Sequence, residues 1–156
     1  MQKPFLAVLC LIAVSACTSP YGNHAKLTDS YNSQMADDGV HELTALYPPA
    51  TTHIALLQPT EDAYGIELVK SLRESGYAIE QGGDANSAYD AANNAPMVTD
   101  NTEAPPAAIL PIHYTVDSIG GALYRITISA EDQTINRVYS VNGDDMLPVG
   151  AWTRKQ

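Results

Sequence analysis

Both cysteines of this 156-residue chain lie in its first 17 residues, so no disulfide can form within the rest of the chain and the fold must depend on its hydrophobic core. The segment around them has the pattern of a secretory signal. Lys3 supplies a positive charge, the apolar run from Phe5 to Val14 is uninterrupted, and Ser15 and Ala16 are small. The apolar run is far shorter than the ~20 residues of a membrane-spanning helix. We therefore predict a signal peptide over residues 1–16, which removes Cys10.

The sequence Val14-Ser15-Ala16-Cys17 resembles the bacterial lipobox. In that motif the thiol is diacylated, the chain is cut before the cysteine, and the new amine is acylated. Two or more acyl chains give stable membrane anchoring, whereas one gives only marginal binding. We predict that Cys17 is a lipidation site and that residues 17–28, which are polar and rich in turn formers, are a lipid-anchored tether. The alternative is an ordinary signal peptide cut near Ala16, which leaves a free cysteine.

Composition limits the size and the partners of the mature chain. Removal of residues 1–16 leaves 140 residues, enough for one domain with tails. The formal net charge of the whole chain is −10, and it becomes −11 once Lys3 is removed. Direct binding of nucleic acid is disfavoured, because it needs a basic face. An acidic surface also repels anionic lipid headgroups, so the acyl chains would hold the protein on the membrane.

The first half of the mature chain has a helix and then a β-α-β pattern. Residues 29–49 carry apolar residues at helical spacing and end at two prolines, which predicts an amphipathic helix: Ala36, Val40, Leu43 and Tyr47. Residues 52–59 read as a strand that is covered on both faces. Thr60 is the expected N-cap of a second helix with Leu68, Val69 and Leu72 on its apolar face and Gly76 at its end. A strand over 76–80 completes a unit with parallel strands.

The second half changes to alternation with a period of two. Residues 82–106 have almost no large apolar side chain, so we predict a low-complexity, disordered insertion. Three strands follow over 109–117, 123–130 and 135–141, and the middle one has apolar and polar residues on opposite faces. The predicted fold class is α+β. It is a small β-α-β-β-β-β sandwich over residues 50–156, with an additional N-terminal amphipathic helix at 29–49 and a disordered insertion at 82–106.

No arrangement of residues predicts catalysis. The four histidines form no pair at metal-ligand spacing, and neither a serine nucleophile elbow nor a phosphate-binding loop occurs. We therefore predict no enzyme activity, no catalytic residue, no metal site and no cofactor.

The C-terminus is the strongest candidate for a partner contact. Residues 147–156 hold the only tryptophan, Trp152, with Arg154 and Lys155 close behind it on an otherwise acidic molecule. Tryptophan and arginine dominate protein interfaces, so these three residues are predicted to bind a partner. The alternative is that Trp152 packs on its own domain and the basic side chains are solvated.

These segments together resemble the TrbH family of conjugal-transfer lipoproteins from plasmid mating systems. The resemblance rests on the lipobox and on segments that cover most of the mature chain: "LYPPATT" (46–52), "IELVKSLRESGYAI" (66–79), "YTVDSIGGALYRITI" (114–128) and "PVGAWTRKQ" (148–156). The family has no catalytic residue to transfer, and only Cys17 carries over, as the acylation site.

The resemblance implies an accessory outer-membrane lipoprotein of a type IV secretion apparatus, facing the periplasm and stabilising the mating-pair channel. The implied partners are a TrbG-like ring protein and a TrbI-like spanning protein, with the membrane bound through acyl chains. Two other classes stay open: a periplasmic lipoprotein that binds a small ligand or peptidoglycan, which needs a defined pocket, and a lipoprotein hydrolase, which needs a nucleophile beside a base.

Overall fold

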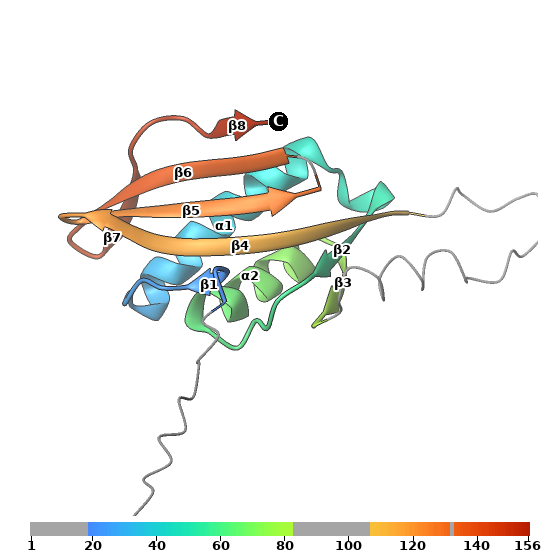
Figure 1. Cartoon of the computed structure of the whole chain (residues 1–156), viewed down its shortest axis with the longest axis horizontal. Coiled ribbons are helices and arrows are strands. Elements are labelled where there is room, and N and C mark those ends of the chain that lie inside the picture. The colour runs from blue at the N-terminus through green and yellow to red at the C-terminus, as the bar shows by residue number, and fades with distance from the viewer. Residues whose placement is uncertain (1–18, 83–106, 132) are drawn as a thin grey trace, which may run out of the picture.

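The structure, a computed structural model, describes residues 19–82, 107–131 and 133–156 (Figure 1). The predicted signal peptide, Cys17 and almost all of the predicted insertion lie outside the described residues. The helices are α1 (Asp29–Leu46), the 3-10 turn η1 (Pro49–Thr51) and α2 (Ala63–Glu74). The strands are β1 (Gly22–Asn23), β2 (Thr52–Leu56), β3 (Ala78–Gln81), β4 (Ala108–Gly120), β5 (Leu123–Ala130), β6 (Gln133–Asn142), β7 (Asp145–Pro148) and β8 (Thr153–Lys155).

The eight strands found among the described residues belong to one mixed sheet. Its order is β3-β2-β4-β5-β6-β7, and β1 and β8 pair with β4 and β6 respectively. The pairs β3-β2, β2-β4 and β1-β4 are parallel, whereas β4, β5, β6 and β7 form an antiparallel meander. The predicted β-α-β unit is therefore confirmed, and so are the three alternating strands that follow the insertion.

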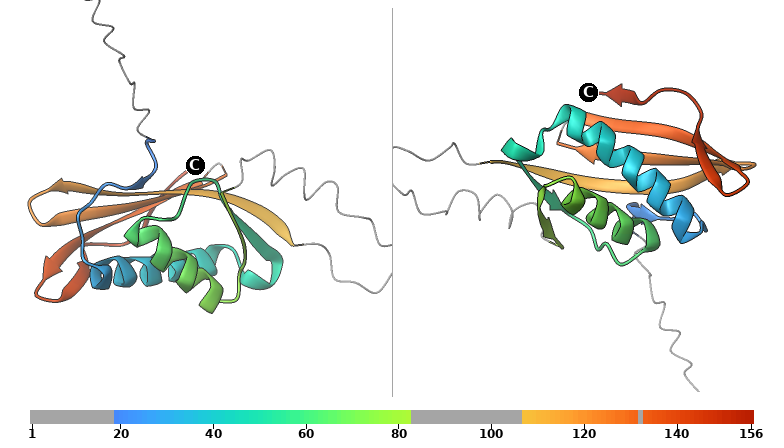
Figure 2. Two further views of the ribbon diagram at one scale, coloured as in Figure 1. Left: turned by 90° about the horizontal axis from the view of Figure 1, so that it is seen from below. Right: turned by 180° about the vertical axis from the view of Figure 1, so that it is seen from behind.

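Both helices lie on the same face of this sheet, so the fold has two layers (Figure 2). The strand residues beneath the helices are apolar and at most 4% exposed, and they form the core: Ile54, Leu56, Leu110, Ile112, Tyr114, Val116, Ile126 and Ile128. We call the other side of the sheet the open face. Its central rows are polar and aligned across three strands: His113, Ser129 and Thr134, and next to them Thr115, Thr127 and Asn136.

Helix α1 packs on the sheet along the stripe that its sequence predicts. Ala36, Val40 and Leu43 are almost fully buried. The helix begins where the Thr28 side chain caps the backbone N–H of Tyr31, and it ends at Leu46, because Pro48 and the η1 turn that follows cannot continue it.

Helix α2 also buries its predicted face, and Gly76 adopts a φ of +88° directly after it. Its predicted N-cap is wrong by two residues: the carboxylate of Asp62, and not Thr60, accepts the hydrogen bond from the backbone N–H of Gly65 (2.8 Å). Asp62 holds this position because the hydroxyl of Tyr114 donates to its second carboxylate oxygen (2.6 Å).

The α+β class is confirmed, with three differences in detail. Strands β1, β7 and β8 are absent from the sequence-based prediction. The predicted amphipathic helix is part of the same domain, because α1 contributes to the same core as the sheet. Finally, the predicted tether at residues 17–28 includes β1, whose residues are hydrogen-bonded to β4.

Gly65 provides a test of this packing. A Cβ added at Gly65 would collide with the hydroxyl of Tyr114. It would also lie 2.8 Å from the Cα of Thr60 and 2.9 Å from the carbonyl oxygen of Thr60. We expect Gly65→Ala to lower the free energy of unfolding by about 1–3 kcal/mol, as overpacking does. Urea unfolding would measure this change.

Gly39 in α1 supplies the matched control. There a Cβ would meet only side-chain atoms, Tyr64 Oη at 3.3 Å and Ile128 Cδ1 at 3.4 Å. Alanine also favours a helix interior over glycine by roughly 0.5–1 kcal/mol. We expect Gly39→Ala to be close to neutral. Equal losses in the two variants would contradict the packing described here.

Candidate interaction surfaces

One edge of β4 is hydrogen-bonded to two separate segments of the chain. Its first half pairs with β2, and Thr115 and Val116 pair with β1. Between them the side-chain amide of Gln58 donates to the carbonyl oxygen of Tyr114 (3.1 Å) and accepts from its backbone N–H (2.9 Å). This amide takes the place of a neighbouring peptide group, so the buried backbone of Tyr114 is fully paired.

The residues before β1 lie against the open face. The ring of Tyr21 stacks on His113, with centroids 3.8 Å apart and an interplanar angle of 9°. The Thr115 hydroxyl donates to the carbonyl oxygen of Pro20 (3.3 Å). Burial lowers the pKa of His113, so its imidazole is neutral at pH 7. The N-terminal chain therefore approaches the sheet on the side opposite to the helices (Figure 2).

A second contact region joins the C-terminal segment to α1. Nη1 of Arg137 donates to both carboxylate oxygens of Asp38 (2.9 Å each), and its Nε donates to the carbonyl oxygen of Gly150 (3.1 Å). The hydroxyl of Tyr139 donates to the same carboxylate (2.5 Å). Burial and then this hydrogen bond raise the pKa of Tyr139, so the phenol stays protonated and remains a donor. The guanidinium also lies 5.8 Å from the centre of the Trp152 ring.

The structure separates the three residues predicted to bind a partner. Trp152 is partly buried and packs against the core beside Arg137, whereas Arg154 donates to Glu42 of α1 (2.8 Å). Lys155 pairs with Thr134 in the sheet register and is exposed on the open face. These side chains therefore do not form one surface. Cys17 lies outside the described residues.

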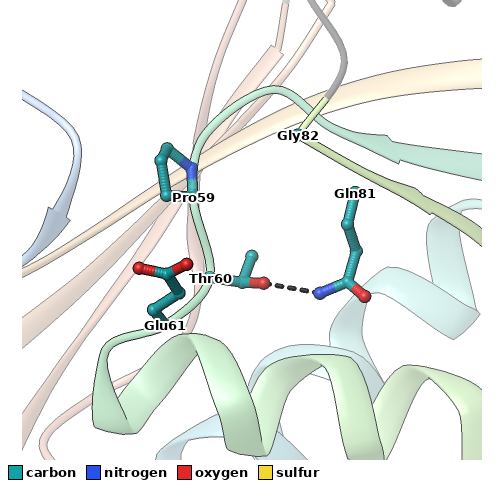
Figure 3. Close-up of a pocket in the computed structure, with 5 residues that line it drawn as sticks. All are labelled: Pro59, Thr60, Glu61, Gln81 and Gly82. Atoms are coloured by element: carbon teal, nitrogen blue, oxygen red, sulfur yellow. Dashed lines mark hydrogen bonds between the residues drawn. The ribbon is translucent and has the colours of Figure 1, made fainter.

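A shallow surface depression of about 370 Å³ lies near these elements (Figure 3). It is lined by Pro59, Thr60, Glu61, Gln81 and Gly82. Two of its polar side chains bond to each other, since Gln81 donates to the Thr60 hydroxyl (2.5 Å) and also accepts from Arg73 (3.0 Å). These groups do not converge on a common point, as the groups of a ligand site do.

Within residues 19–82, 107–131 and 133–156, no group of three or more His, Cys, Asp or Glu side chains is placed to hold a metal ion. In the same part of the chain, neither helix is both long enough and apolar enough to cross a membrane.

Sequence reasoning missed Gln58, Tyr21, Asp38 and Arg137. Their main partners are far away in the chain: 56 residues for Gln58, 92 for Tyr21 and 99 for the pair of Asp38 and Arg137. No local pattern marks such a residue. For Gln58 and Tyr21 the signal is the alternation of β4, which places their partners Tyr114 and His113 on opposite faces of the sheet.

These features define the class of this protein: a small two-layer α+β domain whose N-terminal segment docks on the open face of its sheet. The family model "Conjugal transfer protein TrbH" matches residues 18–156, and the chain belongs to the TrbH family. TrbH proteins act in plasmid conjugal transfer by type IV secretion, and the family is not a known enzyme family. Comparisons with curated proteins and with solved structures found no match.

The bridging role of Gln58 can be tested by its replacement with methionine. Gln58→Met keeps the size of the side chain but leaves the N–H and the carbonyl oxygen of Tyr114 unpaired in a buried site. Each unpaired group costs about 1–3 kcal/mol. We expect a lower urea midpoint and loss of amide-exchange protection at β1.

Gln34 is the matched control for this substitution. The Gln34 amide N–H donates to the carbonyl oxygen of Asp144 (3.1 Å), and the Gln34 amide oxygen accepts from the backbone N–H of Met146 (2.9 Å). These two bonds resemble those of Gln58, but the Gln34 side chain is nearer to solvent. Water can replace its side chain, so Gln34→Met should cost less. A smaller loss for Gln58→Met would argue against the bridge.

The Asp38–Arg137 contact should contribute more to the free energy of unfolding than the Asp117–Arg125 pair on the open face. Asp38→Ala leaves Arg137, with a side chain only 19% exposed, and the Tyr139 hydroxyl without their acceptor. We expect a loss of about 1–3 kcal/mol in the free energy of unfolding. Asp117→Ala frees Arg125, whose side chain is 42% exposed, and should cost less than about 1 kcal/mol. Urea unfolding of both variants tests this order, and the reverse order would contradict it.

Proposed function

We propose that this chain is an accessory lipoprotein of the conjugative DNA-transfer apparatus. In this proposal Cys17 anchors it in the outer membrane, its domain faces the periplasm, and it stabilises the mating-pair channel. The observation that carries the proposal is the family match, which begins at residue 18, directly after the lipobox cysteine. The protein would act by binding and not by catalysis.

The docked N-terminal segment makes this anchor short. Four residues lie between Cys17 and Gly22, the first residue of β1, which makes five steps along the chain. A fully extended chain spans at most about 3.3–3.6 Å per residue, so the reach is on the order of 17 Å. The domain would be held at the membrane surface and would not swing on a tether of twelve residues. Such confinement raises the effective concentration near a membrane-embedded ring, so weak contacts suffice.

The proposed partners are the TrbG-like ring protein and the TrbI-like spanning protein. Of the three C-terminal residues proposed to bind them, Lys155 and the exposed part of Trp152 are available, since Arg154 is paired with Glu42. The alternative function, binding of a small ligand or peptidoglycan, would have to use the depression around Thr60 and Gln81. Its two central side chains already bond to each other, which favours the channel role.

The test is co-purification in mild detergent of the internally tagged chain from cells that carry its native neighbouring genes. We expect the ring components with the natural chain and their loss with Cys17→Ser, because acylation needs the thiol. The matched control is Cys10→Ser, which alters the cysteine in the signal segment and should change nothing. Recovery of the tagged protein alone, with Cys17 intact, would overturn the proposed channel role.

A further inference from the structure

Exposed apolar side chains gather at one end of the open face. Leu123, Ser140 and Leu147 are paired across β5, β6 and β7, so their side chains lie on one face in adjacent rows. Val149 follows two residues after Leu147, and its N–H donates to the carbonyl oxygen of Val138 (2.7 Å), which keeps it on the same face. The exposures of Leu123, Leu147 and Val149 are 37%, 42% and 51%. We call these three residues the apolar patch.

The chain that leads to Cys17 leaves the domain on this same face. Pro20 is held by Thr115, and Tyr21 stacks on His113; both partners are open-face residues of β4. Thr115 pairs with Thr127, which lies four residues from Leu123 along β5, so the N-terminal contacts and the patch share the open face. A surface that holds the N-terminus would therefore also face the patch.

The charge distribution favours this face over the helix layer. Strand positions of the open face hold Glu80, Asp117 and Asp145 against Arg125 and Lys155, and Arg125 forms two hydrogen bonds with Asp117 (2.6 and 3.1 Å). Helices α1 and α2, on the other layer, carry six acidic residues against Lys70 and Arg73, and Arg137 and Arg154 pair with two of the six. The helix layer therefore keeps two net negative charges and the open face one, so an anionic lipid surface repels the open face less.

We infer that the open face, through the apolar patch, rests on the lipid surface that anchors the chain. This inference depends on the proposed acylation of Cys17. The anchor alone would leave the domain free to rotate, whereas contact of the patch with the headgroup boundary fixes its orientation and turns α1 and α2 towards the periplasm. Apolar side chains on an amphipathic surface enter that boundary by about 5–10 Å.

The experiment uses the acylated full chain with one added cysteine. Acylation blocks Cys17 and removal of the signal discards Cys10, so Leu123→Cys or Leu147→Cys supplies the single free thiol for an environment-sensitive fluorophore. The matched control is Ile66→Cys, because Ile66 is also an exposed apolar residue, at 55%, but lies on α2. Each labelled chain is inserted into vesicles of phosphatidylethanolamine and phosphatidylglycerol that contain a lipid with a nitroxide near its headgroup.

We expect the labels at 123 and 147 to be quenched several-fold more strongly by the nitroxide lipid than the label at 66, and less strongly by aqueous iodide. If the chain floats with the vesicles and all three labels are equally open to iodide, the inference is overturned and the anchor stands. Shielding from iodide without quenching by lipid also overturns it, because a second copy, a partner or residues 83–106 would then cover the patch. A chain that does not float overturns the anchor and this inference together.

Discussion

Tyr114 is the residue that joins strand β4 to the β2–α2 connection and to the start of helix α2. Its backbone N–H and carbonyl oxygen bond to the side chain of Gln58, and its hydroxyl bonds to Asp62, the N-cap of α2. Because Tyr114 is fully buried, each of these polar groups would be costly to leave unpaired. Strand β4, the β2–α2 connection and the start of α2 are therefore fixed relative to one another by one side chain and its backbone.

This arrangement also creates the place where the N-terminal segment docks. Parallel pairing of β2 with β4 ends at Ile112, and without Gln58 the edge of β4 beyond that point would be an open ladder. The amide of Gln58 fills one position, and β1 continues from there. A short N-terminal strand is stable only as an addition to an existing edge, so the position of β1 follows from the length of β4 and from Gln58.

The parts of the fold that rest on periodicity could be predicted from the sequence, and the parts that rest on long-range contacts could not. Alternation located β4, β5 and β6, because their core positions are consistently apolar. Strands β1, β7 and β8 have two to four residues each, too few to show a period, and they exist only as neighbours of β4 and β6. The cap of α2 was misplaced for the same reason, since the bond from Tyr114, which selects Asp62, spans 52 residues.

The same distinction applies to the C-terminal segment. Composition singled out Trp152, Arg154 and Lys155 together because they are close in sequence. In a strand, however, successive side chains point to opposite faces, so Arg154 reaches α1 while Lys155 lies on the open face. Trp152 is held beside Arg137, whose guanidinium is itself fixed by Asp38. Strand β8 thus links the sheet to α1 through Arg154 and adds the positive charge of Lys155 to the open face.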